Sequence, residues 1–379
     1  MRIRKFWIVV WLLLLTPLCL WLAWLFTPLR PLNIAIVDKT VLLPNLREHI
    51  SFNWILTNQR ISKIDKEFYE ANSDYLGFFP KTKKKFEVKG LEQYSLPQID
   101  SFAGKVDMAY FTDTYGIYSN EWEGKNILEH SSLIYGGMST QDLHLLKALK
   151  KSKKLILSEF NDIATPTPKN IRNEFKSLFG IEWTGWAGRY YDDLDTNINK
   201  ELPYWLKNGY VKQHANVWPF KKSGIAFVNE NGRIEILEKD THLEYELPYI
   251  KSEESTMNRF NVKDDIDYPY WFDIIRTSRE NNILSWYEIK TNKLGDSVLA
   301  KNGIPKRFPA AIERSIDCKF YYFCGDFADN PVSQWLARFK YIGKIKRTLS
   351  AASEKTDKTP FFWKYYVPMI STILNENFK

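Results

Sequence analysis

The stretch Leu133–Asp162, LIYGGMSTQDLHLLKALKKSKKLILSEFND, decides the fold. It opens with a short apolar run and a Gly-Gly pair, continues with a predicted helix from about Thr140 to Lys150, and ends in the apolar run Leu155–Ser158. The order strand, turn, helix, strand is typical of a sheet that helices cover on both faces. A carboxylate, Glu159, follows the second strand, where some enzymes carry a nucleophile.

The same alternation extends along the chain in both directions. Further strands are predicted at Asn33–Val37, Val106–Phe111, Ser132–Tyr135 and Phe320–Cys324, and further helices at Glu48–Asn58, Lys169–Phe179 and Pro360–Asn375. Short buried strands that alternate with helices predict an α/β fold with a mainly parallel sheet and helices on both faces. The strand at Phe320–Cys324 is expected to be the last strand of this sheet.

The character of the sequence changes after Ile181. The segment Ile181–Tyr190 is rich in glycine and aromatic residues, which favours an ordered loop. Three strands follow at Gly224–Val228, Arg233–Leu237 and Ile283–Ile289, with the hairpin signal Glu230-Asn231-Gly232 between the first two. This pattern predicts a smaller β-rich insertion over residues 221–310, between residues 28–220 and 311–379 of the α/β domain.

An uncharged apolar run, Phe6–Phe26, lies near the N-terminus. It is about as long as the roughly 20 residues that a helix needs to cross a bilayer. Arg2, Arg4 and Lys5 precede the run, so the positive-inside rule places the N-terminus in the cytoplasm and the rest of the chain outside. No small-residue cleavage site follows. The sequence therefore predicts a single-pass membrane protein anchored through residues 6–26, in preference to a cleaved signal peptide.

Composition limits the class of partner. The formal net charge is +8, of which three basic residues lie before the apolar run, and the lysine runs at 81–85 and 150–154 are typical of solvated surface. We therefore expect no nucleic-acid partner. Aromatic residues make up 16% of the chain, and ring faces on loops favour a glycan or envelope-polymer ligand. Protein partners are not indicated.

Cysteine and histidine usage indicates neither a metal site nor a disulfide. Cys318 and Cys324 flank one predicted strand, so about 20 Å of extended chain separates them, which is too far for a disulfide. They are expected to be buried thiols if the strand is continuous, with a disulfide as the alternative. The histidines are dispersed, no zinc-ligand spacing occurs, and no cofactor is implied.

Four acids follow predicted strands within a residue or two: Asp38, Asp113, Glu159 and Asp326. Ligands of open α/β sheets bind beyond the carboxyl ends of the strands, so these acids are expected along one edge. Repulsion between carboxyl groups that lie close together raises some of their pKa values, so that one group serves as an acid and another as a base. Such a group can also bind a divalent cation, or a cationic or polyhydroxylated ligand. In the alternative interpretation, these acids only end strands and cap helices, and Asn161 is a capping residue as well.

Loops near this edge add candidate ligand-binding residues. They are Tyr115 in the loop after the second strand, the pair Gly136 and Gly137, and Trp186 with Arg189 in the aromatic segment. The guanidinium of Arg189 is suited to bidentate binding of a carboxylate or phosphate. The alternative for Arg189 is an ion pair with the nearby aspartates that holds the loop in place.

The segments Leu133–Gly137 and Lys154–Glu159 resemble the core of the class I glutamine amidotransferase-like superfamily, which has a flavodoxin-like α/β fold. In that family a strand ending in Gly-Gly is followed by a helix and by a strand that leads into a G-x-C-x-G nucleophile elbow. Here Glu159 stands in place of the cysteine, without the flanking glycines, and no His-x-Glu pair follows. The resemblance therefore implies a divergent member without glutaminase activity, like the noncatalytic or carbohydrate-associated members of the superfamily.

Three functions follow as hypotheses. The first is an anchored, extracytoplasmic ligand-binding or accessory protein in cell-envelope or polysaccharide metabolism. The second is a hydrolase of glycans or related polymers, with Glu159 and Asp113 as the catalytic pair or with Asp38 or Asp326 as the second carboxylate. The third is a structural subunit of a membrane complex, which predicts an exposed apolar patch and no cavity at the edge of the sheet.

Overall fold

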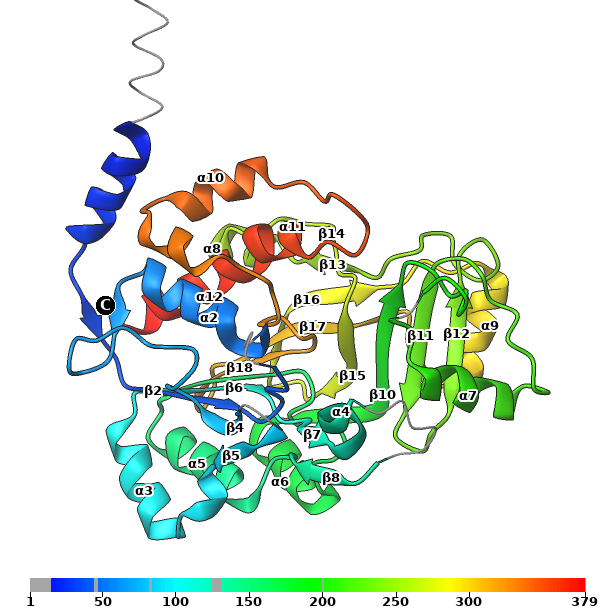
Figure 1. Ribbon diagram of the computed structural model, residues 1–379, viewed down its shortest axis with the longest axis horizontal. Helices are drawn as coiled ribbons and strands as arrows, with labels where there is room; N and C mark the ends of the chain where they lie inside the picture. Colours follow the sequence, from blue (N-terminus) through cyan, green and yellow to red (C-terminus); the bar gives the residue numbers. More distant parts are fainter. Residues whose placement is uncertain (1–14, 44–46, 82–83, 125–130, 200, 379) are drawn as a thin grey trace, which may run out of the picture.

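A ten-stranded sheet forms the centre of the computed structural model, which describes residues 15–43, 47–81, 84–124, 131–199 and 201–378 (Figure 1). Its strand order is β14-β13-β16-β17-β18-β9-β6-β2-β4-β5. In this order the bounds are Ile266–Asp267, Tyr249–Ser252, Asn282–Glu288, Arg307–Arg314, Lys319–Phe323, Leu155–Glu159, Met108–Asp113, Ile34–Asp38, Leu76–Pro80 and Phe86–Lys89.

The sheet is mixed, so the prediction of a mainly parallel sheet is wrong. The five middle strands β18, β9, β6, β2 and β4 run parallel to one another. The strands on both sides of them are antiparallel. Antiparallel neighbours need only a short connection, whereas parallel neighbours need a crossover such as a helix. The helix-strand alternation of the sequence therefore predicted the middle of the sheet and not its edges.

The middle strands are apolar because both of their faces are covered. Every residue of β2, β6 and β9 is buried, which is typical of strands inside a parallel sheet. Helices α3, α5 and α6 lie on one face of the sheet, and α2, α8 and α12 lie on the other (Figure 1). Their bounds are Leu96–Lys105, Thr140–Lys151, Lys169–Phe179, Arg47–Asn58, Glu254–Phe260 and Val367–Asn377.

Local signals start and end two of these helices. Ser139 and Asp142 form a capping box at the start of α5, and α6 ends at Gly180, whose φ of +68° places it in the left-handed region. The predicted C-terminal helix is a continuous run of α11 (Thr359–Phe361), the π-turn η4 (Phe362–Tyr366) and α12.

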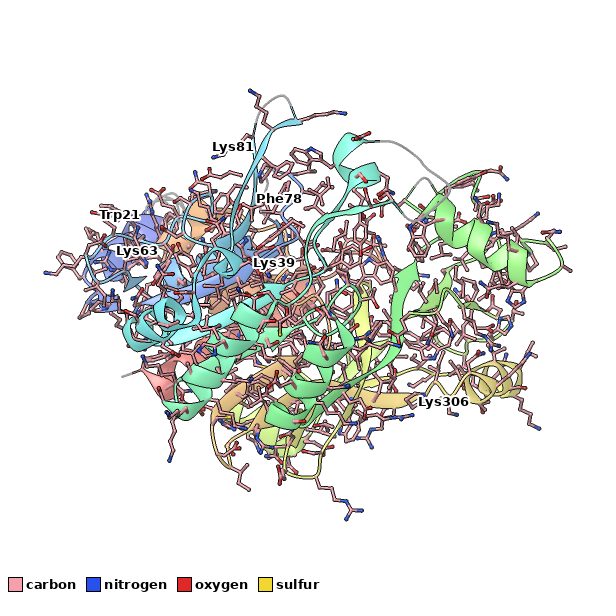
Figure 2. The ribbon with its side chains drawn as sticks, turned by 90° about the horizontal axis from the view of Figure 1, so that it is seen from below. Trp21, Lys39, Lys63, Phe78, Lys81 and Lys306 are labelled. Carbon is pink, nitrogen blue, oxygen red and sulfur yellow. The ribbon has the colours of Figure 1, made fainter. Side chains whose placement is uncertain are left out.

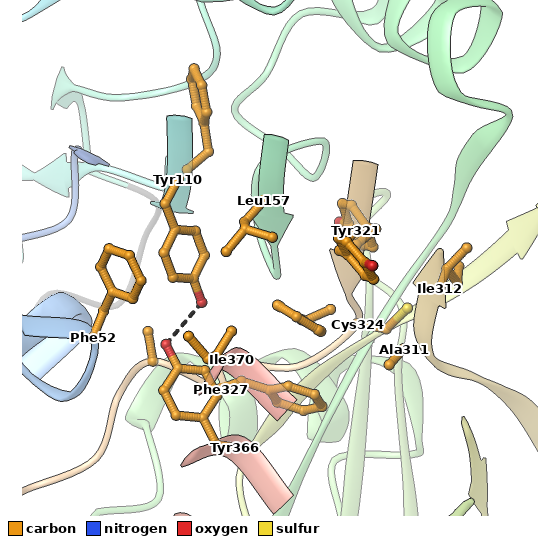
Figure 3. Close-up of a cluster of buried hydrophobic side chains, with 14 of the residues drawn as sticks. Phe52, Tyr110, Leu157, Ala311, Ile312, Tyr321, Cys324, Phe327, Tyr366 and Ile370 are labelled. Carbon is orange, nitrogen blue, oxygen red and sulfur yellow. Dashed lines mark hydrogen bonds between the residues drawn. The ribbon is translucent and has the colours of Figure 1, made fainter. Parts of the chain in front are cut away.

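The C-terminal run packs against the middle of the sheet. The hydroxyl groups of Tyr110 on β6 and Tyr366 in η4 are 3.0 Å apart, and Phe52, Leu157 and Phe327 surround them (Figure 3). All five side chains are buried. This layer joins the carboxyl ends of the parallel strands to the last residues of the fold.

The segment expected to be an ordered loop, Ile181–Tyr190, is part of an eleven-residue strand, β10 (Ile181–Tyr191), so that prediction is wrong. β10 lies in a second, antiparallel sheet of order β12-β11-β10-β15, with bounds Ile234–Glu238 for β12, Gly224–Asn229 for β11 and Trp271–Thr277 for β15. Gly185, with φ +89°, lies where the register between β10 and β15 shifts. The glycines that suggested a loop therefore serve a bulge within a strand.

The strand before the Gly-Gly pair also differs from its prediction. β8 (Leu133–Tyr135) pairs with β7 (Ile117–Tyr118) in a separate two-stranded sheet and does not join the central one. A further short pair is β1 (Arg30–Pro31) with β3 (Ile61–Ser62). The remaining elements are η2 Leu91–Gln93, α4 Ser119–Glu123, α7 Tyr204–Gln213, α9 Lys293–Lys301, η3 Gln334–Arg338 and α10 Ile342–Leu349.

The N-terminal transmembrane helix predicted as part of the fold needs correction. Residues 15–25 of the predicted span are helical, and residues 6–14 lie outside the described residues. Across the part of the chain that the structure describes, no helix combines the length and apolar character that a membrane crossing requires. The three cysteines are unpaired as predicted, with Cys318 and Cys324 buried.

Candidate functional site at the carboxyl edge of the sheet

The parallel strands bring two of the predicted acids side by side. Asp38 ends β2 and Asp113 ends β6, and the two residues are partners in the register of these strands. Thr40 connects them: its backbone N–H donates to Asp38 Oδ1 (3.0 Å), and its hydroxyl donates to Asp113 Oδ1 (2.8 Å). His49 Nδ1 lies 2.5 Å from Asp38 Oδ2. Both carboxyl groups are buried and held in fixed positions by these neighbours.

Asn161 reaches the same edge from the loop after β9. Its side-chain amide donates to Asp113 Oδ2 (3.4 Å), and its backbone N–H donates to Asp273 Oδ2 on β15 (3.1 Å). Its φ of +68° lies in the left-handed region, which asparagine adopts more readily than most residues. Asn161 therefore does not cap a helix, and it ties the central sheet to the second sheet.

Glu159 lies at the end of β9 but its side chain points into the protein. Oε2 accepts hydrogen bonds from the backbone N–H groups of Phe327 (2.9 Å) and Ala328 (3.2 Å), and Oε1 accepts one from the hydroxyl of Tyr110 (2.7 Å). The side chain is fully buried. Burial, with the nearby charge of Asp326, raises the pKa of Glu159 well above its ordinary value, so its neutral form is favoured.

Asp326 belongs to a group of carboxyls that influence each other. Burial, with the charge of Asp329, raises the pKa of Asp326, and Asp113 and Asp38 act in the same direction. Burial and Asp38 raise the pKa of Glu48 to about 9, and burial is the main reason why the pKa of Asp113 is about 7. We call Asp38, Glu48, Asp113, Asp326 and Asp329 the rim carboxyls. Burial and mutual repulsion therefore favour the neutral forms of Glu48, Asp113 and Asp326.

The loop residues predicted at this edge lie against a buried lysine. Gly137 donates its N–H to the carbonyl of Thr114 (2.6 Å), and its own carbonyl accepts from Lys39 Nζ (3.0 Å). Gly136 has a φ of +151°, and a Cβ there would lie 2.5 Å from the carbonyl oxygen of Tyr115. The two glycines are therefore needed for the close approach of two loops, and Tyr115 supplies its backbone to that contact.

Lys39 neutralises acids beside the rim. Its Nζ lies 2.5 Å from Asp142 Oδ2 and also pairs with Glu92, and both Lys39 and Asp142 are buried. Although burial lowers the pKa of Lys39, the charges of Asp142 and Glu92 raise it above its ordinary value. In Figure 2, Lys39 lies inside the molecule, whereas Lys81 lies at the far end of the β4–β5 hairpin. Lys39 is therefore a structural cation.

A cavity of about 200 Å³ lies where β10 meets the loops before β15 and before α11. Its walls are formed by Arg189, Tyr190, Tyr191, Asp192, Glu201, Pro269, Tyr270, Thr356 and Lys358. The Arg189 guanidinium lies 4.8 Å from the ring centre of Tyr191 and 5.1 Å from that of Tyr270. Lys358 Nζ lies 3.5 Å from the ring centre of Tyr270 and 3.4 Å from Asp329 Oδ2. Lys358 thus links the cavity to the rim carboxyls.

Arg189 has capacity for a further hydrogen bond. Its Nη2 lies 3.3 Å from Glu201 Oε2, and the Glu201 side chain is 80% exposed. Its Nε is buried and has no hydrogen-bond partner in the described part of the protein. The pairing with Glu201 also replaces the predicted pairing with the aspartates that follow β10. Trp186 is not in this cavity: it lies three positions earlier in the same strand, so its side chain points to the opposite face and is buried in the core.

The structure thus brings Asp38, Asp113, Asn161 and Asp326 together at the carboxyl edge, with Gly136, Gly137 and Tyr115 beside them. Glu159 points away from this edge into the core, and Trp186 lies apart. Within the described ranges, no three or more His, Cys, Asp and Glu side chains are placed so that they could hold a metal ion. Whether these residues bind a ligand or catalyse a reaction stays a prediction.

Sequence reasoning missed Glu48, Asp329, Tyr270 and Lys358. Glu48 lies on α2, and the other three lie in loops whose positions depend on contacts far away in the sequence. A weak signal existed for Asp329, because it lies three residues after Asp326 in the loop that follows the last predicted strand. Nothing in the sequence around Lys358 distinguishes it from the surface lysines nearby.

Comparisons with known proteins found a distant likeness to solved structures. No family model and no curated protein matches it. The crystal structure of SMU.1228c is 11% identical and covers 91% of this chain and 99% of its own, with a TM-score of 0.37. Two proteins described as ThuA-like are similar. That from Bacteroides uniformis ATCC 8492 is 8% identical over 78% of this chain and 84% of its own (TM-score 0.35), and that from Parabacteroides merdae ATCC 43184 is 9% identical over 78% and 79% (TM-score 0.34).

With TM-scores this low, the likeness assigns neither a family nor an activity to the chain.

Proposed function

We propose that this chain is a binding protein for acidic saccharides in polysaccharide or cell-envelope metabolism, with its site in the cavity formed by Arg189, Tyr191, Tyr270 and Lys358. The observation that carries the proposal is the position of Arg189. Its guanidinium lies against tyrosine rings in a cavity, and among the described residues its buried Nε lacks a partner and its one ion pair is with a largely exposed glutamate. A ligand carboxylate can replace Glu201 and take two guanidinium hydrogen bonds.

The size and the walls of the cavity favour a single sugar ring. Its volume of about 200 Å³ is below the roughly 300–1,000 Å³ typical of pockets for drug-sized ligands. Asp192 and Glu201 offer acceptors for the hydroxyl groups of a sugar ring.

Binding is better supported than hydrolysis. Both oxygens of Glu159 already accept hydrogen bonds from within the protein, so the predicted catalytic carboxylate has no oxygen directed at a ligand. Glutaminase activity is not proposed, because a carboxylate stands where the related enzymes carry a cysteine and cannot act as the thiolate does.

The test compares two arginines in similar settings. Arg172 lies 5.4 Å from the ring centre of Trp183, pairs with Glu230 at 2.9 Å, and also has a buried Nε without a partner, but it is not in the cavity. Calorimetric titration with glucuronate oligosaccharides should show binding that Arg189→Gln weakens about tenfold or more, from the roughly 1.5–3 kcal/mol of a charged hydrogen bond. Arg172→Gln should leave binding unchanged.

Glucose oligosaccharides provide the second arm, and they should bind more weakly than the acidic ones. Equal binding of neutral and acidic oligosaccharides would contradict the proposed role of Arg189. Release of new reducing ends from the acidic oligosaccharide would instead favour the hydrolase hypothesis.

A further inference from the structure

One face of the molecule combines exposed aromatic and aliphatic side chains with unpaired basic charge. It is formed by η3, α10 and the short link between them, residues 334–349, and we call it the α10 face. Trp335, Tyr341 and Leu349 are 63%, 54% and 73% exposed, and Ile345 lies between them on α10. Large apolar side chains exposed together in this way indicate a contact surface.

The charge of the α10 face has one sign. Residues 334–349 contain five Lys and Arg residues and no Asp or Glu. No ion pair among the described residues involves Arg338, Lys340, Lys344, Lys346 or Arg347. This contrasts with the lysines of the β4–β5 hairpin, where Lys81 and Lys89 pair with Glu87. A basic surface without internal counter-charges is complementary to an anionic partner.

The helix at residues 15–25 continues this apolar surface. Its exposed side chains Leu15, Leu18, Trp21 and Leu25 recur at helical spacing on one face, while Trp24 on the other face is buried and donates its indole N–H to the carbonyl of Thr57 (2.9 Å). The backbone N–H of Lys340 donates to the carbonyl of Leu20 (3.0 Å), which places this helix beside the α10 face. The two lie on the same side of the molecule in Figure 1, and Figure 2 shows Trp21 at its margin.

We propose that the α10 face lies on the surface of an anionic lipid bilayer. Amphipathic helices with Lys and Arg beside Trp and Leu insert their apolar residues at the level of the headgroups, while the basic residues bind acidic headgroups. Trp and Tyr are also the side chains most favoured at that depth. This is a contact along the bilayer plane, and it does not depend on a helix that crosses the membrane.

A cavity beneath α10 gives this contact a place for part of a lipid. Its volume is about 170 Å³, and its walls include Leu336, Lys346, Phe362 and Trp363. Asn330, Ser333, Lys358 and Thr359 also line the cavity, so its walls are partly apolar and partly polar and suit the region where an acyl chain meets its headgroup. A soluble anionic polymer would use the lysines but not Trp335, Leu349 or the apolar walls, so the observations favour a lipid surface.

The experiment measures binding of the full chain to vesicles of phosphatidylcholine alone and of phosphatidylcholine with phosphatidylglycerol in equal parts. The first vesicle accounts for charge-independent binding, including that of the uncharged run Phe6–Phe26, and the basic residues Arg2, Arg4 and Lys5 are the same in every variant. Each basic residue near an anionic surface contributes about 1 kcal/mol, and the new carboxylates add repulsion, so Lys344→Glu with Lys346→Glu should weaken the phosphatidylglycerol-dependent binding at least about 30-fold. The matched control is Lys151→Glu with Lys301→Glu, two exposed lysines at the ends of α5 and α9.

Depth of insertion is tested separately with an environment-sensitive fluorophore on Leu349→Cys in a Cys19→Ser chain. Its emission should rise on anionic vesicles and be quenched by nitroxide lipids, whereas the same fluorophore on Lys151→Cys should not respond. Three results would overturn the proposal: no dependence on phosphatidylglycerol, an equal loss in the control variant, or equally tight binding to a soluble polyanion such as heparin without quenching by lipid.

Discussion

Replacement of Glu159 by alanine should destabilise the fold more than most substitutions of an acid do. The side chain fills a buried position between β9, β6 and the turn after β18. Alanine removes the acceptor for the N–H groups of Phe327 and Ala328 and for the hydroxyl of Tyr110, at distances of 2.9, 3.2 and 2.7 Å. Two backbone donors are then buried without a partner.

The magnitude follows from these lost hydrogen bonds. A buried donor without a partner costs about 1–3 kcal/mol, so two donors, with the loss of the tyrosine contact, give about 3–5 kcal/mol for Glu159→Ala. Glu159→Gln keeps an oxygen for both N–H groups, and its amide can donate to Tyr110. Because the raised pKa of Glu159 favours its neutral form, the glutamine variant should lie within about 1 kcal/mol of the wild type.

Urea unfolding followed by circular dichroism measures both values. The control is Glu182→Ala, because Glu182 is 43% exposed and, among the described residues, forms an ion pair with Lys176 alone, so its loss should cost under about 0.5 kcal/mol. If Glu159→Ala costs no more than the control, the structural role of Glu159 is refuted. If the glutamine variant is as unstable as the alanine variant, the protein needs the charged form, and the reasoning from burial fails.

Three other predictions concern the neighbourhood of the rim. Burial raises the pKa of Asp113 from 3.8 to about 7, so the folded state keeps a proton that the unfolded state releases, and this group lowers stability as pH rises from about 4 to 7. Asp113→Asn should remove up to about 4 kcal/mol of this pH-dependent loss in the free energy of unfolding. Urea titrations at several pH values measure it, and an unchanged dependence on pH would contradict the raised pKa. Lys39→Met should cost about 3–5 kcal/mol in thermal unfolding, because the buried Asp142 loses its partner. Asp142→Asn in the same chain should restore part of the lost stability. A cost below about 1 kcal/mol for Lys39→Met would show that the pair is dispensable. Gly77→Ala should cost about 3 kcal/mol or more, because φ at Gly77 is +154° and a Cβ would lie 1.6 Å from a carbonyl oxygen of β2. The control Gly104→Ala in α3 should be neutral or stabilising. Equal urea midpoints for the two variants would refute the packing argument.

The sequence was sufficient for the inner part of the fold. Apolar runs without alternation predicted β2, β6, β9 and β18, and their order with α5 and α6 follows the predicted pattern. The sequence was misleading at β10, where the amino-acid composition suggested a loop and the structure has a strand. β10 contains glycines and tryptophans that resemble a loop, yet it is paired on both sides, because partners far along the chain decide its state.

The position of the rim could be predicted, but the directions of its side chains could not. The rule for parallel strands places Asp38 and Asp113 together without knowledge of any contact. The inward direction of Glu159 depends on the amide of Phe327, which is 168 residues further along the chain. Lys358 likewise reaches Asp329 and Tyr270 only through the loop that precedes α11.

The pairing of β9 with β18 has a consequence for biosynthesis. Leu155 and Lys319 are partners in two adjacent parallel strands, and all of the second sheet lies between them in the sequence. Arg30, near the start, binds the side chain of Asn375 (2.7 Å) and the carbonyl of Phe378 near the end. A nascent chain therefore cannot complete its main hydrophobic layer until its final helix has left the ribosome, and contacts so distant in sequence favour slow folding. Assistance by a chaperone during that interval would protect the exposed strands.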